Sequence, residues 1–125
     1  MANVQIKTQN FKTAALCSDN CCCVAIRQDE EFFYIADTKN KDQKPLVFKT
    51  SDAEVFKKAV KNGEFDLDVL TYDSQYGIAV RRDGFSVLVS NPQFPYYGFM
   101  RFTLKEWSAF IHGVKEGEFD SEVIF

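Results

Sequence analysis

Apolar and polar residues along the chain follow a strand-then-helix order, and that order occurs twice. Alternating or continuous apolar runs predict the strands of the first half at residues 4–8, 22–27, 32–36 and 46–49. Residues 11–16 either extend the first strand or form a further one, and residues 28–31 have the polar composition of a hairpin turn. Ala53, Phe56 and Val60 then fall at helical spacing, which predicts an amphipathic helix after the strands.

The second half of the chain shows the same order of patterns. Its predicted strands lie at residues 67–72, 77–81, 85–90 and 99–102. Asp83-Gly84, between two of these strands, is typical of a tight hairpin because both residues tolerate a positive φ. The helix predicted after them has a wider apolar stripe than the first, formed by Trp107, Phe110, Ile111 and Val114.

Both predicted helices end at a copied seven-residue motif. Residues 60–66 read Val-Lys-Asn-Gly-Glu-Phe-Asp and residues 114–120 read Val-Lys-Glu-Gly-Glu-Phe-Asp, so six of seven positions are identical. The glycine in each copy can take the left-handed conformation that ends a helix, and the phenylalanine after it is expected to pack back on the last turn. The motif is therefore interpreted as a structural clasp.

Two capping boxes predict where the helices begin. Ser51 with Glu54, and Thr103 with Glu106, each place a hydroxyl residue three positions before a glutamate, so that side chains and backbone amides of the first turn can bond reciprocally. In the repeat alignment the two boxes are two positions out of step, which predicts that the second helix begins earlier than the first.

An offset of 54 residues aligns residues 23–66 with residues 77–120 without a gap, and eleven of the 44 aligned positions are identical. Average composition would give about three identities over such a length. The chain is therefore predicted to be α+β, with two tandem β-β-β(-β)-α repeats in which one helix packs each antiparallel sheet, related by a pseudo-two-fold axis. Residues 1–125 are expected to form one domain, with repeats at about 4–66 and 67–125.

Composition limits the class of protein. Hydrophobic residues make up 46% and aromatic residues 15% of the chain, which is ample for a packed core and argues against disorder. The formal net charge of -3 does not favour binding to nucleic acid or an anionic membrane by the whole chain, although a local basic face remains compatible with it. Because the first residues lack the apolar run of a signal peptide and no segment is long enough to cross a bilayer, the expected location is cytoplasmic, with no membrane partner.

The four cysteines, Cys17, Cys21, Cys22 and Cys23, crowd into one short stretch with no distant partners, so a disulfide framework is not expected. On a strand, Cys21 and Cys23 would share one face and Cys22 the other, which disfavours a shared metal ion. The favoured interpretation is thiols packed as small apolar groups, with easy oxidation of any exposed ones. No metal and no cofactor are predicted.

The sequence also lacks a catalytic constellation. His112 is the only histidine, and no serine or cysteine nucleophile stands at a recognisable spacing from it. Acidic pairs such as Asp66 with Asp68, and Glu116 with Glu118, fall at helix ends, where carboxylates commonly bond turns. A non-enzymatic role is therefore expected.

The two copies contain several short motifs: Phe11-Lys12-Thr13, Cys23-Val24, Ile35-Ala36-Asp37-Thr38-Lys39, Leu46-Val47-Phe48, Phe102, Glu106-Trp107-Ser108-Ala109-Phe110 and both Gly-Glu-Phe-Asp endings. Together these segments resemble a small bacterial family, the domain of unknown function numbered 397, which includes BldB-like developmental regulators of actinobacteria. The chain departs from the family at Ala53, where the family has tryptophan, and at Asn91-Pro92-Gln93, where it has Asp-Ser-Lys. The resemblance covers most of the chain and implies a regulatory role beside helix-turn-helix regulators, without catalytic residues.

Two surfaces are candidates for binding. The loop with Phe94, Tyr96 and Tyr97 between two prolines has the exposed-aromatic composition of protein contacts, unless these rings fold over an uncovered sheet face. A sheet face with Arg27, Tyr34, Arg81 and Arg82 would instead stack bases and contact phosphates.

The leading hypothesis is a regulatory or protein-interaction module that binds a partner protein, a transcription regulator if the resemblance holds. The alternative is a single-stranded nucleic-acid-binding protein, by fold-level analogy with the Pur-alpha and PC-four-like proteins, which share the β-β-β-β-α order. The chain is expected to be a monomer or a homodimer.

Overall fold

A computed structural model describes residues 11–16, 24–40, 42–70, 77–94 and 98–120, and the backbone of residues 72–73. The strand predicted at residues 4–8 lies outside this part of the chain. The first repeat consists of β1 (Lys12–Thr13), β2 (Val24–Gln28), β3 (Phe32–Asp37), β4 (Leu46–Lys49) and α1 (Thr50–Lys61). The second consists of β5 (Tyr72–Asp73), β6 (Ala79–Asp83), β7 (Ser86–Ser90), β8 (Phe99–Thr103) and α2 (Leu104–Lys115).

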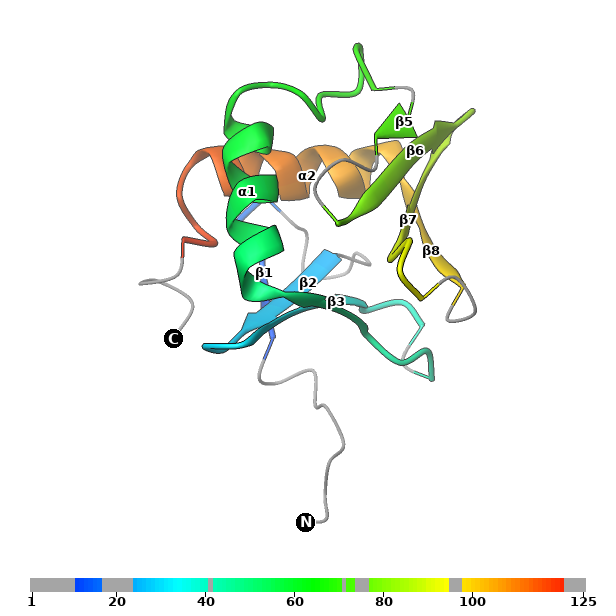
Figure 1. The fold of residues 1–125 in the computed structure, drawn as a ribbon. Coiled ribbons are helices and arrows are strands. Elements are labelled where there is room, and N and C mark those ends of the chain that lie inside the picture. Colours follow the sequence, from blue (N-terminus) through cyan, green and yellow to red (C-terminus); the bar gives the residue numbers. More distant parts are fainter. Residues whose placement is uncertain are drawn as a thin grey trace.

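Each repeat forms an antiparallel sheet whose strands follow their order in the chain, β1-β2-β3-β4 in one sheet and β5-β6-β7-β8 in the other. A helix follows the last strand of each sheet, so the predicted α+β class and the β-β-β(-β)-α repeats are confirmed. In Figure 1 the two helices cross, with the first sheet below them and the second sheet to the right. The α2 helix packs on β7 and β8 of its own sheet and also reaches β2 of the first.

One hydrophobic cluster draws its buried side chains from both repeats. Strand pleating sends alternate residues into it, such as Phe33 and Ile35 of β3 and Val87 and Val89 of β7, all of which are fully buried. Trp107 of α2 is also fully buried. Neither sheet therefore covers its inner face with its own helix alone, because the two repeats share a core.

The contacts between the repeats are reciprocal. Phe56 of α1 and Phe110 of α2 occupy aligned positions, and their rings stack with centroids 6.5 Å apart and planes inclined by 17°. Lys61 pairs with Asp120 at 2.8 Å, and the aligned Lys115 pairs with Asp66 at 2.6 Å. Each lysine thus bonds the aspartate that ends the other repeat, as in the self-complementary interface of a two-fold dimer.

The copied motif ends both helices as predicted. Gly63 and Gly117 have φ values of 84° and 81°, the left-handed conformation that an L side chain rarely adopts. The amide that follows each glycine bonds the carbonyl five residues earlier, Glu64 to Ala59 at 3.1 Å and Glu118 to Gly113 at 2.9 Å, which is the Schellman arrangement.

The phenylalanines of the motif, Phe65 and Phe119, are fully buried and pack on the helix of their own repeat. The centroids of Phe65 and Phe56 are 4.8 Å apart, and those of Phe119 and Phe110 are 5.5 Å apart. The phenylalanine carbonyls accept hydrogen bonds from the opposite helix: Trp107 Nε1 donates to Phe65 at 3.3 Å, and Lys57 Nζ donates to Phe119 at 2.9 Å. The motif therefore joins the two repeats as well as closing each helix.

The prediction for the start of α1 was wrong. Its N-cap is Lys49, which makes no side-chain capping bond, and Ser51 lies inside the helix. The β2–β3 turn supplies the missing partners: the Thr50 amide donates to the Glu31 carbonyl at 2.9 Å, and the Thr50 hydroxyl donates to the Asp29 carbonyl at 3.0 Å. Since β4 runs directly into α1, this contact between turn and helix decides where α1 begins.

The second capping box is confirmed. Thr103 accepts a hydrogen bond from the Glu106 amide at 3.0 Å, and the Glu106 side chain accepts one from the Thr103 amide at 2.8 Å. Both helices nevertheless begin at aligned positions, Thr50 and Leu104, so the prediction of an earlier start for the second helix was wrong. Only the second helix has a side-chain cap at this aligned start.

One strand prediction and one turn prediction in the second repeat also needed correction. Residues 67–70 form a turn in which the amides of Val69 and Leu70 donate to the Asp66 carbonyl, at 3.1 and 2.9 Å, so the strand predicted at 67–72 begins only at Tyr72. The hairpin at Asp83-Gly84 is present, but its turn residues are Gly84 and Phe85, with Gly84 at a φ of 61°.

In the described ranges, neither helix has the length and apolar character needed to span a bilayer.

Candidate functional site

The outer face of the first sheet holds two of the predicted binding residues. Arg27 of β2 lies directly opposite Tyr34 of β3, with its guanidinium carbon 4.9 Å from the ring centroid. Arg27 also pairs with Asp29 at 3.6 Å, and the Tyr34 hydroxyl lies 3.4 Å from the same carboxylate. The arginine thus covers a face of the tyrosine ring, which a stacked base would otherwise contact.

Asp29 organises this corner of the sheet. Its Oδ1 accepts hydrogen bonds from the amides of Glu31 at 2.9 Å and Phe32 at 2.7 Å. Partial burial raises the pKa of the Asp29 carboxyl, but the Phe32 and Glu31 amides, the Arg27 charge and the Tyr34 hydroxyl together hold that pKa below its usual value. The ionised carboxylate therefore fixes the turn and the Arg27–Tyr34 pair at the same time.

The structure separates the other two predicted arginines. Arg81 is exposed on the outer face of β6, at the position aligned with Arg27. Arg82 follows it and points to the opposite face, where it donates to the carbonyls of Leu67 at 2.9 Å and Gly84 at 3.3 Å. Arg82 thus bonds the segment after α1 and its own hairpin turn, and it does not share a face with Arg81.

The outer face of the second sheet has a hollow of about 230 Å³, lined by Ala79, Arg81, Leu88, Ser90 and Phe99. Half of the Phe99 side chain is exposed, and Arg101 of the same strand lies 5.8 Å from its ring centroid. Arg101 also pairs with Asp83 at 3.5 Å. The hollow therefore combines an apolar floor with the guanidinium group of Arg81.

The predicted aromatic loop joins the strand ends beside this hollow. Phe94 is 40% exposed, whereas the neighbouring Asn91 is buried and donates to the Val47 carbonyl of β4 at 2.8 Å. The Asn91 side chain also accepts a bond from the Gln93 amide at 2.9 Å, so the start of the loop is anchored on the first repeat. Tyr96 and Tyr97 lie outside the described residues.

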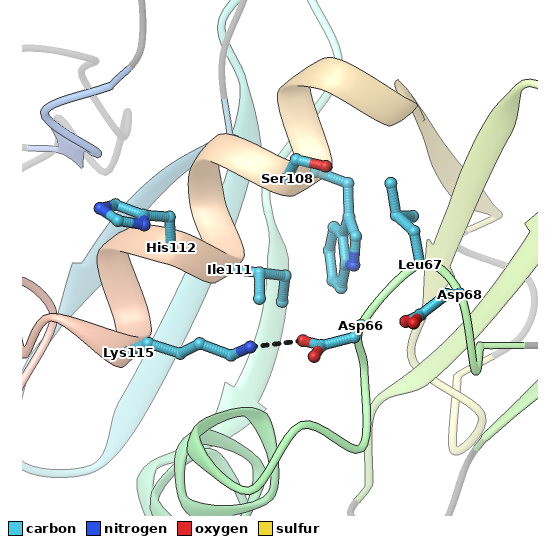
Figure 2. A pocket seen from close by; sticks show the side chains of 8 residues that line it. Asp66, Leu67, Asp68, Ser108, Ile111, His112 and Lys115 are labelled. Carbon is cyan, nitrogen blue, oxygen red and sulfur yellow. Dashed lines mark hydrogen bonds and ion pairs between the residues drawn. The ribbon is translucent and has the colours of Figure 1, made fainter.

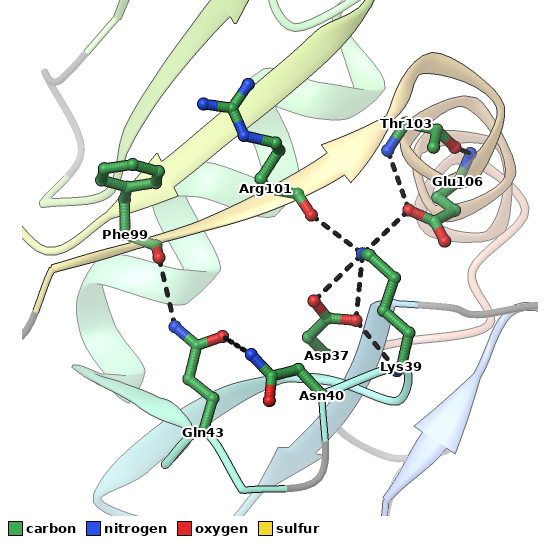
Figure 3. A network of polar contacts seen from close by, with 8 residues as sticks. All are labelled: Asp37, Lys39, Asn40, Gln43, Phe99, Arg101, Thr103 and Glu106. Carbon is green, nitrogen blue, oxygen red and sulfur yellow. Dashed lines mark hydrogen bonds and ion pairs between the residues drawn. The ribbon is translucent and has the colours of Figure 1, made fainter.

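A polar network along β8, where Lys39 and Gln43 of the first repeat meet this strand, was not predicted (Figure 3). Lys39 Nζ lies 3.0 Å from Asp37 Oδ2, 3.2 Å from Glu106 Oε1 and 2.8 Å from the Arg101 carbonyl. Asp37 and Glu106 are buried, so this one ammonium neutralises two carboxylates from different repeats. An open hollow of about 380 Å³ adjoins the network, and Gln43 closes one side of it by donating to the Phe99 carbonyl at 3.1 Å.

The Asn91 and Lys39 contacts are related by the repeat. Asn91 is aligned with Asp37, and Val47, whose carbonyl it bonds, is aligned with Arg101, whose carbonyl Lys39 bonds. The segment that follows the third strand of the meander in each repeat thus bonds the fourth strand of the other. Asn91-Pro92-Gln93 aligns with Asp37-Thr38-Lys39, so a neutral amide in the second repeat stands where the first repeat has a charged link.

A third hollow, of about 400 Å³, lies between α2 and residues 66–68 (Figure 2). Its apolar floor comes from Leu67, Trp107 and Ile111, and its rim carries Ser108, His112 and the Asp66–Lys115 pair. His112 is exposed, in agreement with the surface position expected for it. No hydrogen bond joins the Ser108 hydroxyl to His112 among the contacts of the described residues, so these two side chains do not form an activated serine–histidine pair.

The remaining predictions for chemistry concern the cysteines. All four lie outside the residues that the structure describes. Within the described ranges, no three histidine, cysteine, aspartate or glutamate side chains are grouped as metal ligands would be.

Comparisons of the chain with protein-family models, with curated proteins and with solved structures give no match. The resemblance to the family numbered 397 therefore stays a prediction.

Proposed function

We propose that this chain is a non-enzymatic regulatory module that binds a partner protein through the outer face of its second sheet. The surface consists of Phe94, Phe99, Leu88 and the exposed Arg81, and it is called here the outer-sheet surface. The observation that carries the proposal is the 50% exposure of Phe99 in the lining of an apolar hollow, together with the 40% exposure of Phe94 on the loop that leads into the same strand. Exposed aromatic side chains next to arginine are typical of the centres of protein interfaces.

Rigid support favours this surface for recognition. Asn91 fixes the loop before Phe94 to the Val47 carbonyl, and Gln43 bonds the Phe99 carbonyl, so both aromatic residues sit on backbone anchored to the other repeat. An anchored aromatic side chain loses little conformational freedom on binding, which favours affinity. The resemblance to the family numbered 397 indicates a transcription regulator as the first class of partner to test.

The alternative is a single-stranded nucleic-acid-binding protein that uses Arg27, Tyr34 and Arg81, and the aromatic-basic character of the outer faces supports it. Against it, phosphate contacts would compete with the Arg27–Asp29 and Arg101–Asp83 pairs, and the net charge is -3. The protein-binding proposal therefore has the better support.

Affinity capture from an extract of the native host, read by quantitative mass spectrometry, tests the proposal. Wild-type protein and a Phe85→Ser control should enrich the same partner, because Phe85 is 88% exposed at the far hairpin tip. The Phe94→Ser/Phe99→Ser variant should enrich that partner about tenfold less than the wild type does, because it lacks two aromatic anchors of the interface. Equal capture by all three proteins would refute the assigned surface.

A titration with labelled single-stranded oligonucleotides distinguishes the nucleic-acid-binding alternative from the protein-binding proposal. Micromolar, salt-sensitive binding that weakens in Arg81→Gln would favour the nucleic-acid function. The protein-binding proposal expects no binding even at low salt.

A further inference from the structure

The hollow between α2 and residues 66–68 is separate from the outer-sheet surface. Its walls come from both repeats, since α2 supplies Trp107, Ile111 and Lys115, and the segment after α1 supplies Asp66 and Asp68. The Asp66–Lys115 pair at 2.6 Å ties the two walls at one end. The hollow, of about 400 Å³, is therefore held open by the same contacts that join the repeats.

The chemistry of this hollow combines an apolar floor with negative charge. Ile111 and Trp107 are buried beneath it, and Leu67 is packed against the core. Figure 2 shows the Asp66 and Asp68 carboxylates on the wall that faces α2. Asp66 is neutralised by Lys115, whereas Asp68 is exposed and has no bond or ion pair with any residue that the structure describes.

The helix wall of the hollow has no counterpart in the first repeat, because α1 carries different residues at the aligned positions. The residues of α1 aligned with Trp107, Ser108, Ile111 and His112 are Ala53, Glu54, Lys57 and Lys58. Lys57 is buried and directs its ammonium to the Phe119 carbonyl and to Glu54, at 2.9 Å each. At the aligned site of the second repeat, Ile111 leaves an apolar wall and Trp107 takes over the bond to the phenylalanine carbonyl, at 3.3 Å.

We propose that this hollow binds a lysine or arginine side chain presented by a basic segment of a partner protein. The methylene stem would pack on Leu67 and Ile111, and the cationic head would pair with Asp68. Charge complementarity supports this occupant, because the available carboxylate lies beside apolar surface and the chain carries a net charge of -3. The site is a second interaction surface and does not depend on the outer-sheet surface.

Trp107 is the only tryptophan in the chain, so its indole N–H signal in a ¹H–¹⁵N spectrum reports on this hollow without further assignment. The probes are two blocked hexapeptides, acetyl-Gly-Leu-Lys-Arg-Leu-Gly-amide and its analogue with two glutamates in place of the basic residues. The basic peptide is expected to shift the indole signal in a saturable and salt-sensitive way, and the acidic peptide is expected to leave it unchanged.

Matched neutralising substitutions identify the carboxylate. Asp68→Asn should weaken binding of the basic peptide about fivefold, the upper range for an exposed ion pair. Asp42→Asn removes an exposed carboxylate elsewhere on the surface and should bind as wild type does. The Phe94→Ser/Phe99→Ser variant should also bind the peptide normally, which distinguishes this site from the proposed partner surface.

Three results would overturn the proposal: no shift with the basic peptide, equal shifts with both peptides, or equal affinities of the wild-type and Asp68→Asn proteins.

Discussion

Replacement of Phe65 by alanine tests the interpretation of the copied motif as a clasp. The ring is fully buried, lies 4.8 Å from the Phe56 ring, and follows the glycine that ends α1. Truncation of a buried phenylalanine to alanine costs about 3–5 kcal/mol, and the loss of the aromatic pair lies within that range. For 125 residues, a loss of about 4 kcal/mol corresponds to a Tm decrease of roughly 15 °C.

Thermal unfolding followed by circular dichroism, with urea titration at 25 °C, measures this loss. Phe85→Ala is the matched control, because the same truncation at an 88% exposed ring should change stability by less than about 0.5 kcal/mol. Since Phe65 belongs to a cluster shared by both repeats, the variant should still unfold in a single transition.

Two outcomes would refute the clasp interpretation. A Phe65→Ala protein as stable as the Phe85→Ala control would show that the buried ring contributes little. A variant that keeps its stability but no longer binds a partner would make the motif a recognition element instead.

Three further predictions concern single contacts. Thr103→Ala should destabilise the protein by about 1 kcal/mol through loss of a helix cap, whereas Ser51→Ala should stay within about 0.5 kcal/mol, both measured by urea titration; equal losses would contradict the assigned N-caps. Lys39→Met should cost about 1–3 kcal/mol because it leaves two buried carboxylates without their shared cation, and Lys44→Met, at an exposed position, should cost almost nothing; equal effects would refute a structural role for the network. Asp29 has a lowered pKa, so its stabilising contribution is present above its unfolded pKa of about 3.8 and is lost as the pH falls through the lower folded value. Between pH 6 and pH 2 the wild type should therefore lose more stability than Asp29→Asn, and parallel pH curves of unfolding free energy would count against this assignment.

Four of the eleven positions that the two repeats share lie where the repeats meet. Phe56, Lys61, Phe65 and Asp66 are identical to their aligned partners, and each takes part in the contacts across or beside the pseudo-two-fold axis. The candidate binding surfaces combine shared and divergent positions: Arg81 is identical to its aligned Arg27, whereas Ile111 is aligned with Lys57. The apolar lining of these surfaces is therefore the part that differs between the repeats.

The sequence alone predicted the surface position of several candidate binding residues. Phe94 is exposed on a loop between strands, and Arg27, Tyr34 and Arg81 lie on outer sheet faces, as a period of two allows. The same period places Arg82 on the opposite face from Arg81. The prediction that both arginines share one sheet face was therefore inconsistent with the strand pattern itself.

Local sequence patterns did not predict that Lys39, Asn91 and Lys57 join the two repeats. Each bonds a residue of the other repeat, between 44 and 67 positions away in the chain. The resemblance did include Asp37 and Lys39 in a motif, but it gave no reason for their occurrence. Their partners depend on how two sheets and two helices come together.

The sequence by itself determined the order of strands and helices, their duplication and the glycine-terminated helix ends, because periodicity and capping act over a few neighbouring residues. The tertiary structure alone decided where α1 begins, since a turn from another hairpin supplies its first partners. It also decided that the copied motif joins the repeats, with Lys61 on Asp120 and Lys115 on Asp66. Those pairings require the two repeats to meet around a pseudo-two-fold axis, and no local pattern records that geometry.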